Sequence, residues 1–317
     1  MRKTCVEMVH ALAKRDERVV FIGSDLSPGL LSEMKQEFPD RYYMEGISEA
    51  NCVGMAAGMA LEGYIPYINT IATFLTRRCY EQVAVDLCLH NLPVRLIANG
   101  GGLVYAPLGP THVAIEDLAI MRALPNMTVV AVADAAEMKR FMEVSLDWPS
   151  PIYIRMGKGG DPIVTRDAEP FKIGKAYLLR KEGDNGRLPV LIVSTGIMTG
   201  RALAAAKLLF ERDIAVEVLH MPTIKPLDEE TLKVHGAKAR LVVTVEEGTL
   251  IGGLGSAVLD SLSEKLGRSM PMVRRLGIPD SFIYDYGNQD WLMEVCGLQP
   301  KQIAKTISED VDLLAAA

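Results

Sequence analysis

The 317-residue sequence predicts an α/β protein of two doubly wound domains. Domains usually have roughly 100–200 residues, so this length indicates two of them. Hydrophobic residues make up 49% of the chain and aromatic residues only 6%, a composition that favours aliphatic globular cores and excludes disorder. Short β-branched runs alternate with helix-patterned segments, and this order is typical of parallel sheets covered by helices on both faces.

The first half of the chain opens with a helix-patterned segment at 4–14 and a β-branched run at 19–22, which stops at Gly23. We therefore expect a helix followed by a strand, and the same alternation continues. Further helices are expected at 50–61, 75–90, 113–123 and 135–146. Further strands are expected at 65–68, 94–98, 128–132 and 152–155.

The second half repeats this alternation after a change in composition. Residues 157–169 are rich in Gly, Pro, Asp and Lys, as in a linker, and 175–180 leads into a Gly- and Asp-rich turn at 182–186, as in a hairpin. Strands are then expected at 190–194, 214–219 and 241–245, and helices at 199–211, 228–234 and 255–266. The expected segments are a first domain at 1–160, a linker and hairpin at 161–188, and a second domain at 189–317.

Charge and cysteine content exclude several classes of protein. The net charge is −6 and the basic residues are scattered, so neither nucleic acid nor an anionic membrane is an expected partner. The five cysteines form no CxxC pair, which indicates reduced thiols rather than disulfides or a zinc site. No signal peptide and no run of about 18 apolar residues occurs. We therefore expect a cytoplasmic protein.

Four segments place polar or glycine residues at strand ends, where open α/β sheets bind ligands. In the first, Glu49 begins a helix of small and apolar residues that we expect to be buried. Glu49 is either a first-turn acid favoured by the helix dipole or a buried carboxylate that holds or shares a proton. In the second, at 70–82, Phe74 and Tyr80 fit core positions and the arginines fit a solvated helix face.

The third segment joins three glycines at 100–102 to His112. Consecutive glycines favour a close approach of the backbone to a ligand, and His112, in a strand-to-helix loop, is either structural or catalytic. The fourth segment, at 246–248 and 252–255, lacks the GxGxxG spacing of a dinucleotide site, so tight strand–helix packing explains it better. An NAD-binding oxidoreductase is kept as an alternative hypothesis.

Taken together and in order, these segments resemble the transketolase superfamily. The resemblance covers nearly the whole chain, from Val19 to about Ile307, and implies a thiamine-pyrimidine-binding domain followed by a transketolase C-terminal domain. Its most specific motifs are Gly-Ile-Ser-Glu-Ala-Asn at 46–51, Thr-Phe-Leu at 73–75 with Tyr-Glu-Gln at 80–82, Gly-Pro-Thr-His at 109–112 with Glu-Asp at 116–117, and Leu-Pro-Asn-Met at 124–127.

The resemblance implies that thiamine diphosphate is the cofactor. Glu49 corresponds to the family glutamate that hydrogen-bonds N1′ of the aminopyrimidine and thereby promotes loss of the thiazolium C2 proton. Phe74 corresponds to the aromatic residue stacked on the pyrimidine, and Asp25 and Ile71 correspond to further cofactor contacts. His112 corresponds to the histidine that contacts the donor carbonyl and stabilises its developing charge.

The resemblance also bears on the substrate. Besides His112, three cations are predicted to contact an anionic group of the substrate: Arg77, Arg155 and Lys158. Three positions carry apolar or glycine residues where related transketolases have polar ones: Gly29, Gly100 and Leu108. These departures favour a substrate outside the ordinary pentose phosphates.

One expected part of the cofactor site is missing. The family anchors the diphosphate through Mg²⁺ with Gly-Asp-Gly and a downstream Asn, and the nearest string here, at 183–186, lies in the second half. We therefore expect no metal ligands in this chain and an N-terminal partner subunit that holds Mg²⁺, in an α2β2 heterotetramer.

The implied activity is that of a transferase of aldehyde or ketone residues, which moves a two-carbon ketol unit between sugars. The alternatives are the β subunit of a 2-oxoacid dehydrogenase, a deoxyxylulose-phosphate-synthase-like acyl synthase, and a non-catalytic partner of another thiamine enzyme. Retention of Glu49 disfavours the non-catalytic partner.

Overall fold

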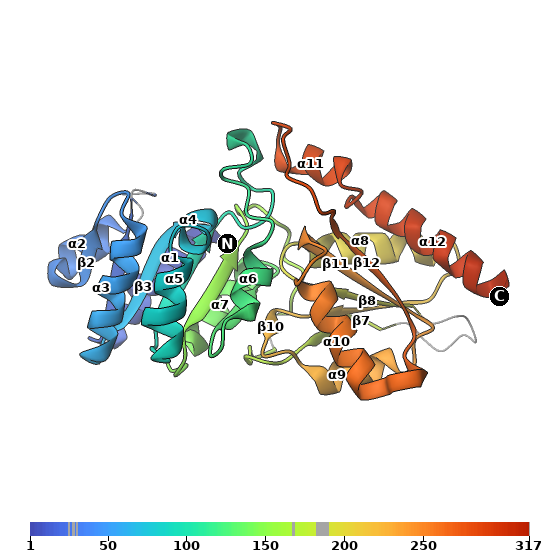
Figure 1. Cartoon of the computed structure of the whole chain (residues 1–317), viewed down its shortest axis with the longest axis horizontal. Coiled ribbons are helices and arrows are strands. Elements are labelled where there is room, and N and C mark those ends of the chain that lie inside the picture. The colour runs from blue at the N-terminus through green and yellow to red at the C-terminus, as the bar shows by residue number, and fades with distance from the viewer. Residues whose placement is uncertain (25, 27–28, 30, 167–168, 182–189, 317) are drawn as a thin grey trace.

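The chain forms two α/β units, each built on one sheet (Figure 1). The computed structural model describes residues 1–317 except 25, 27–28, 30, 167–168, 182–189 and 317. In spatial order, the strands of the first sheet are β10 (Thr223–Lys225), β5 (Thr128–Ala131), β6 (Ile152–Met156), β4 (Arg95–Asn99), β3 (Ile65–Ile71), β1 (Val19–Gly23) and β2 (Tyr42–Met44). Those of the second sheet are β12 (Met272–Ile278), β11 (Leu241–Thr249), β8 (Val190–Ser194), β9 (Val216–His220) and β7 (Tyr177–Arg180).

Neighbouring strands run parallel except at one edge of each sheet, where β10 and β7 are antiparallel. Helices cover both faces. Around the first sheet they are α1 (Arg2–Arg15), α2 (Ser32–Glu37), α3 (Glu49–Leu61), α4 (Ala72–Thr76), α5 (Tyr80–Gln82), the π-helix η2 (Val83–Leu89), α6 (Asp117–Ala123) and α7 (Ala135–Ser145), with short 3₁₀ turns η1 (Pro39–Arg41) and η3 (Ala106–Leu108). Around the second they are α8 (Met198–Phe210), α9 (Glu229–Gly236), α10 (Leu254–Leu266), η4 (Gly267–Ser269), α11 (Gln289–Val295) and α12 (Pro300–Ala316). The predicted class, two doubly wound α/β units, is confirmed.

Successive residues of β1 are buried on opposite faces of the first sheet. Val19 and Phe21 of β1 pack in the hydrophobic layer that contains α1 and α7. Val20 and Ile22 pack in the layer on the other face, with α3, α4 and α6. Both sets are buried because successive side chains of a strand point to opposite faces and helices cover each face.

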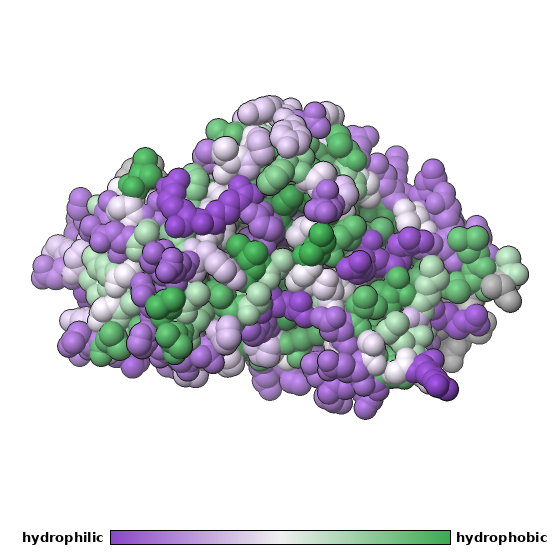
Figure 2. Space-filling view, viewed as in Figure 1, coloured by the Kyte–Doolittle hydropathy of each residue, from purple (hydrophilic) through white to green (hydrophobic). Residues whose placement is uncertain are grey.

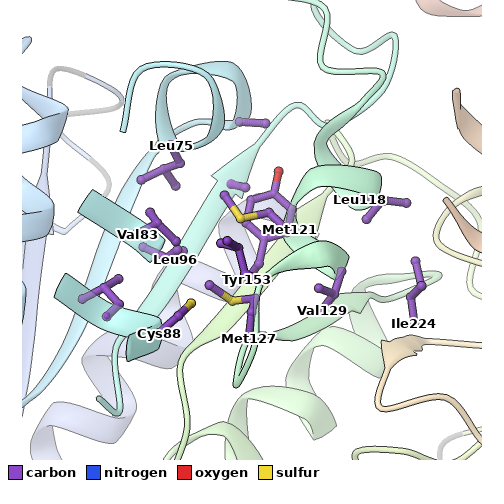
Figure 3. Close-up of a cluster of buried hydrophobic side chains, with 14 of the residues drawn as sticks. Leu75, Val83, Cys88, Leu96, Leu118, Met121, Met127, Val129, Tyr153 and Ile224 are labelled. Carbon is purple, nitrogen blue, oxygen red and sulfur yellow. The ribbon is translucent and has the colours of Figure 1, made fainter. Parts of the chain in front are cut away.

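The two units share one hydrophobic core. Strand β10 comes from the second half of the chain but joins the first sheet beside β5, with Thr223 opposite Val130. Ile224 of β10 therefore packs in the same cluster as Val129 and Tyr153 (Figure 3). This buried contact fixes the position of the second unit against the first.

The helix predicted at 75–90 is interrupted. α4 ends at Thr76 and α5 begins at Tyr80, so that the intervening residues form a turn. The Thr76 hydroxyl donates to the carbonyl of Ala72, and the Cys79 thiol donates to the carbonyl of Phe74. Such side-chain bonds to the backbone compete with continued helix. The helix predicted at 113–123 is also shorter, because Ala114 forms a β-bridge with Gly102 and α6 starts at Asp117.

Two further expectations need correction. The predicted hairpin is wrong, because β7 pairs with β9 rather than with β8, which follows it in sequence. The turn predicted at 182–186 lies outside the described residues. The helix that begins at Glu49 is buried on one face only, since Gly58 is exposed and Leu61 is 65% exposed.

Among the described residues, no helix combines the length and the apolar character needed to cross a membrane.

Candidate active site

Glu49 is a buried carboxylate with incomplete hydrogen bonding. It is the first residue of α3 and is 1% exposed. Nη1 of Arg78 donates to its Oε2 at 2.6 Å, whereas Oε1 is buried and has no hydrogen-bond partner among the described residues. Buried polar atoms are nearly always paired, so Oε1 is open to a hydrogen bond from water or from a ligand. Glu49 is therefore a buried, ion-paired carboxylate rather than a solvated acid of the first turn.

The interrupted helix places an aromatic face beside this carboxylate. Phe74 lies in α4, directly before the turn, and the guanidinium carbon of Arg78 lies 4.1 Å from the centroid of its ring. The ring of His112 meets Phe74 edge-on, with 5.3 Å between centroids. Four residues therefore form one continuous cluster, which we call the ring cluster: Glu49, Phe74, Arg78 and His112.

His112 lies in a turn rather than at the start of a helix, because α6 begins later, at Asp117. Its Nδ1 is 2.9 Å from Oγ1 of Thr111. The turn is held by Arg77, which pairs with Glu116 and donates to the carbonyl of Val113 at 2.9 Å. Hydrogen bonding to Glu116 raises the pKa of Arg77 above its ordinary value. Arg77 thus anchors the loop that carries the histidine.

The structure separates the other predicted site residues. Arg155 is buried, and its guanidinium donates to Asp117 at 2.9 Å and to the carbonyl of Glu247 at 2.5 Å, away from the ring cluster. Lys158 is exposed on the loop after β6, and none of the described hydrogen bonds or ion pairs joins it to the ring cluster. Ile71 is half-buried at the end of β3, directly before α4. Asp25 lies outside the described residues.

The glycines at 100–102 pack against the protein's own side chains, which accounts for them without a ligand. A Cβ on Gly100 would lie 2.1 Å from the ring of Tyr105, and one on Gly102 would lie 2.3 Å from the carboxyl carbon of Glu247. Both glycines also have positive φ, of 72° and 66°. The same contacts explain why a histidine cannot replace Gly100 in this loop.

The start of α10 is already bound by an internal carboxylate. Glu246 accepts hydrogen bonds from the backbone N–H groups of Leu254 and Gly255, at 2.9 and 2.8 Å. A Cβ at Gly253 would lie 2.1 Å from Oε2 of Glu246. These N–H groups are those that would bind a nucleotide phosphate, so the NAD hypothesis is wrong and strand–helix packing explains the glycines.

An open groove of about 610 Å³ lies between the two units. Arg77 and Glu116 line it from the first unit, and Thr249 and the segment 279–282 line it from the second. It lies next to the loop that carries His112, because Arg77 donates to the carbonyl of Pro110 at 3.1 Å. Among the described residues, no group of three or more His, Cys, Asp or Glu side chains is placed to hold a metal ion.

Two regions of the chain match known family models. Residues 1–160 match the transketolase pyrimidine binding domain, and residues 174–303 match the transketolase C-terminal domain. A 6-deoxy-6-sulfo-D-fructose transketolase subunit from Clostridium sp. (strain MSTE9) is 36% identical, over 98% of this chain and 94% of the relative. A 1-deoxy-D-xylulose-5-phosphate synthase from Synechococcus sp. (strain JA-3-3Ab) is 38% identical, over 96% of this chain but only 46% of the relative.

A solved structure described as a split-gene transketolase, an inactive β4 tetramer, is 35% identical. It superposes with a TM-score of 0.88 over 98% of each chain. The fold of the present chain, both units included, is therefore that of a known subunit.

Proposed function

The chain belongs to the transketolase family, and from this premise we propose that it supplies the pyrimidine half of a thiamine diphosphate site in a split transketolase. Its reaction would be the transfer of a two-carbon ketol unit between sugars. The observation that carries the proposal is the ring cluster, in which the unpaired Oε1 of the buried Glu49 lies in the same group of residues as the aromatic face of Phe74.

The residues present fit the aminopyrimidine ring. Phe74 offers a flat apolar face, and Glu49 offers a carboxylate oxygen that no described residue uses. When bound, the cofactor supplies the carbanion chemistry that forms and breaks the carbon–carbon bond beside a carbonyl. Glu49 would hold or share a proton at N1′. Thr111 engages Nδ1 of His112, so the histidine would contact the donor carbonyl oxygen through Nε2.

The proposed partner would cover the exposed side of α3. This helix is apolar nearly all round, which is typical of a helix buried on every side. Yet some apolar residues and a glycine on α3 and η2 stay exposed, and Figure 2 shows hydrophobic residues scattered among hydrophilic ones over this part of the molecule. We call these residues the α3 face: Gly58, Leu61, Val85 and Leu89. Because Glu49 begins α3, a subunit docked here would lie close to the ring cluster and could bring the diphosphate and Mg²⁺ site.

Cofactor titration tests the proposal directly. Thiamine diphosphate and Mg²⁺ are titrated calorimetrically into the chain alone and into its mixture with a subunit that carries Gly-Asp-Gly and the downstream Asn. We expect weak binding by the single chain and tight binding by the mixture, because each chain would hold half of the site. Tight, Mg²⁺-dependent binding by the single chain would contradict the split-site proposal.

The α3 face is tested by Gly58→Leu. A Cβ at Gly58 meets nothing within 4 Å, so leucine fits the free chain, and it also favours helix. In the assembly it would meet the partner, so we expect affinity for the partner to fall by about tenfold or more. Ala204→Leu, at an exposed position of α8, is the matched control and should assemble normally. Equal assembly of both variants, measured by analytical ultracentrifugation, would place the partner elsewhere.

A small anionic sugar is the proposed substrate class. The names of the relatives refer to a sulfonated and to a phosphorylated sugar. Lys158 is exposed and stays in the proposal as an anion contact. Arg77 lines the open groove and stays with it, but Glu116 and two loop carbonyls already bind its guanidinium, so an anion would have to share those N–H groups. Arg155 does not stay in the proposal, because it is buried and bound to Asp117.

The acyl-synthase alternative is favoured by one observation, the match to full-length synthases over nearly the whole of this chain. The two activities differ in whether CO₂ is released, since an acyl synthase decarboxylates a 2-oxoacid donor. We expect the assembled enzyme to use a ketose donor without releasing CO₂. Turnover that depends on pyruvate and releases CO₂ would select the synthase.

We also propose that the chain divides into 1–160, 161–188 and 189–317, although β10 of the last segment joins the first sheet. We further propose a cytoplasmic location, which is supported by five cysteines that are all unpaired thiols.

A further inference from the structure

Arg78 makes two contacts at once. Its guanidinium stacks on Phe74, with 4.1 Å from its central carbon to the ring centroid, and its Nη1 donates to Glu49 at 2.6 Å. The two partners of this ion pair differ in exposure, because the side chain of Arg78 is 44% exposed and that of Glu49 only 1%. Arg78 therefore covers the buried carboxylate from the solvent side.

The stack on Phe74 is the contact that the proposed pyrimidine ring would also make, and the bond of Arg78 to Oε2 lies on the carboxylate whose Oε1 the ring would use. A guanidinium is flat and delocalised, stacks on aromatic rings and donates N–H groups to carboxylates, much as an aminopyrimidine does. Two flat groups cannot both stack on the same face of Phe74, so a ring stacked where Arg78 lies would displace it. We infer that Arg78 is an internal placeholder, which occupies the ring site in the free chain and leaves it when the cofactor ring binds. This inference rests on the proposed function.

The local structure allows this exchange. Arg78 lies in the turn between α4 and α5, so its side chain can rotate towards solvent without moving a helix. The following residue, Cys79, is buried and bonded to the carbonyl of Phe74, which keeps the turn itself in place. An ion pair with one partner so exposed contributes little stability, whereas the carboxylate without any partner would be left uncompensated. Arg78 thus compensates the charge of Glu49 in the free chain and is displaced by a ring that binds Glu49 more strongly.

A binding experiment on the full chain tests the exchange. The probe is 4-amino-5-hydroxymethyl-2-methylpyrimidine, the ring without thiazolium or diphosphate. If Arg78 competes for the site, the apparent affinity of the free chain is reduced by the fraction of molecules in the closed state. We therefore expect Arg78→Met to bind the probe about tenfold more tightly than the unmodified chain. Arg240→Met, at an exposed position in the second unit, is the control and should bind like the unmodified chain.

A second measurement needs no ligand. If Arg78 compensates Glu49 in the free chain, Arg78→Met should lower the thermal midpoint in the unmodified chain but not in a Glu49→Gln background. Additive effects of the two substitutions would overturn the inference, whatever the probe does. Equal or weaker binding of the probe by Arg78→Met would also overturn it while leaving the cofactor proposal standing. If the effects of the two substitutions on the thermal midpoint are coupled but no variant binds the probe, both the proposed cofactor site and the exchange are overturned.

Discussion

Two buried glutamates of this chain show how a candidate catalytic residue differs from a structural one. Glu49 is 1% exposed and Glu247 is 3% exposed. Oε1 of Glu247 accepts from the backbone N–H of Leu103 and from Nε2 of Gln289, both at 2.7 Å. Oε1 of Glu49 accepts nothing from the described residues, and its Oε2 is bound only by a half-exposed arginine.

The difference shows that burial alone does not identify a functional carboxylate. Glu247 joins the glycine-rich loop of the first unit to α11 of the second, so its bonds hold the two units together. Glu49 is bonded only to Arg78 of the same unit and lies in the same cluster as an aromatic face. An unpaired oxygen at the edge of an uncovered surface is therefore the more informative signal.

The largest expected effect comes from Glu49→Gln. An amide cannot hold the proton at N1′ in the same way, so we expect C2 deprotonation to slow by about 10²–10⁴-fold with little change in stability. Hydrogen–deuterium exchange at the cofactor C2, in the assembled complex, measures this step. Glu62→Gln, at the exposed C-cap of the same helix, is the matched control. An unaltered exchange rate in Glu49→Gln would mean that Glu49 acts only as a first-turn acid of the helix.

Glu247→Ala should act on stability instead. It leaves the donors of Leu103 and Gln289 unpaired inside the protein, so we expect a loss of about 3 kcal/mol in the free energy of unfolding. Urea denaturation measures the loss. The control Glu62→Ala should change the free energy of unfolding by less than about 0.5 kcal/mol. If both alanine variants unfold alike, Glu247 does not hold the units together and the comparison fails.

The smallest expected effect is the pH dependence of the stability that Glu247 contributes. Burial raises the pKa of Glu247, and the charge of Arg155 opposes the shift only in part. A carboxyl group with a raised pKa in the folded state stabilises fully below its unfolded pKa, about 4.3, and loses that contribution as pH rises through the folded value. We therefore expect the stability gap between the unmodified chain and Glu247→Gln to shrink from pH 4 to 7. A gap that widens over this range would mean that the ionised form is the stabilising one.

The proximity of three proposed site residues could be anticipated from the sequence because each stands in a short motif. Glu49, Phe74 and His112 were chosen from three separate segments, and the structure brings all three into the ring cluster. Arg78 was missed because two adjacent arginines look alike in a continuous helix. Only the break after Thr76 separates them, and the hydrogen bonds of Thr76 and Cys79 that cause the break are not visible in hydrophobic periodicity.

The burial of Arg155 and the presence of several edge strands leave only a weak signal in the sequence. Arg155 was expected to contact substrate, but it lies within a strand whose five residues are all buried, and an ion pair with Asp117 compensates its charge. The sequence does not predict strands β2, β10 and β12, since β2 and β10 have only three residues each and β12 carries two adjacent arginines in its centre. Short and charged strands at sheet edges leave little periodic signal.

Strand β10 has a consequence for the first unit when it is separated from the second. A fragment that ended at residue 160 would lose β10, so β5 would become an open edge with unpaired backbone groups along Val129 to Ala131. Such an edge is a template for pairing with another chain, and the apolar surface that Ile224 covers would be exposed beside it. We therefore expect a fragment of residues 1–160 to aggregate more readily than the full chain.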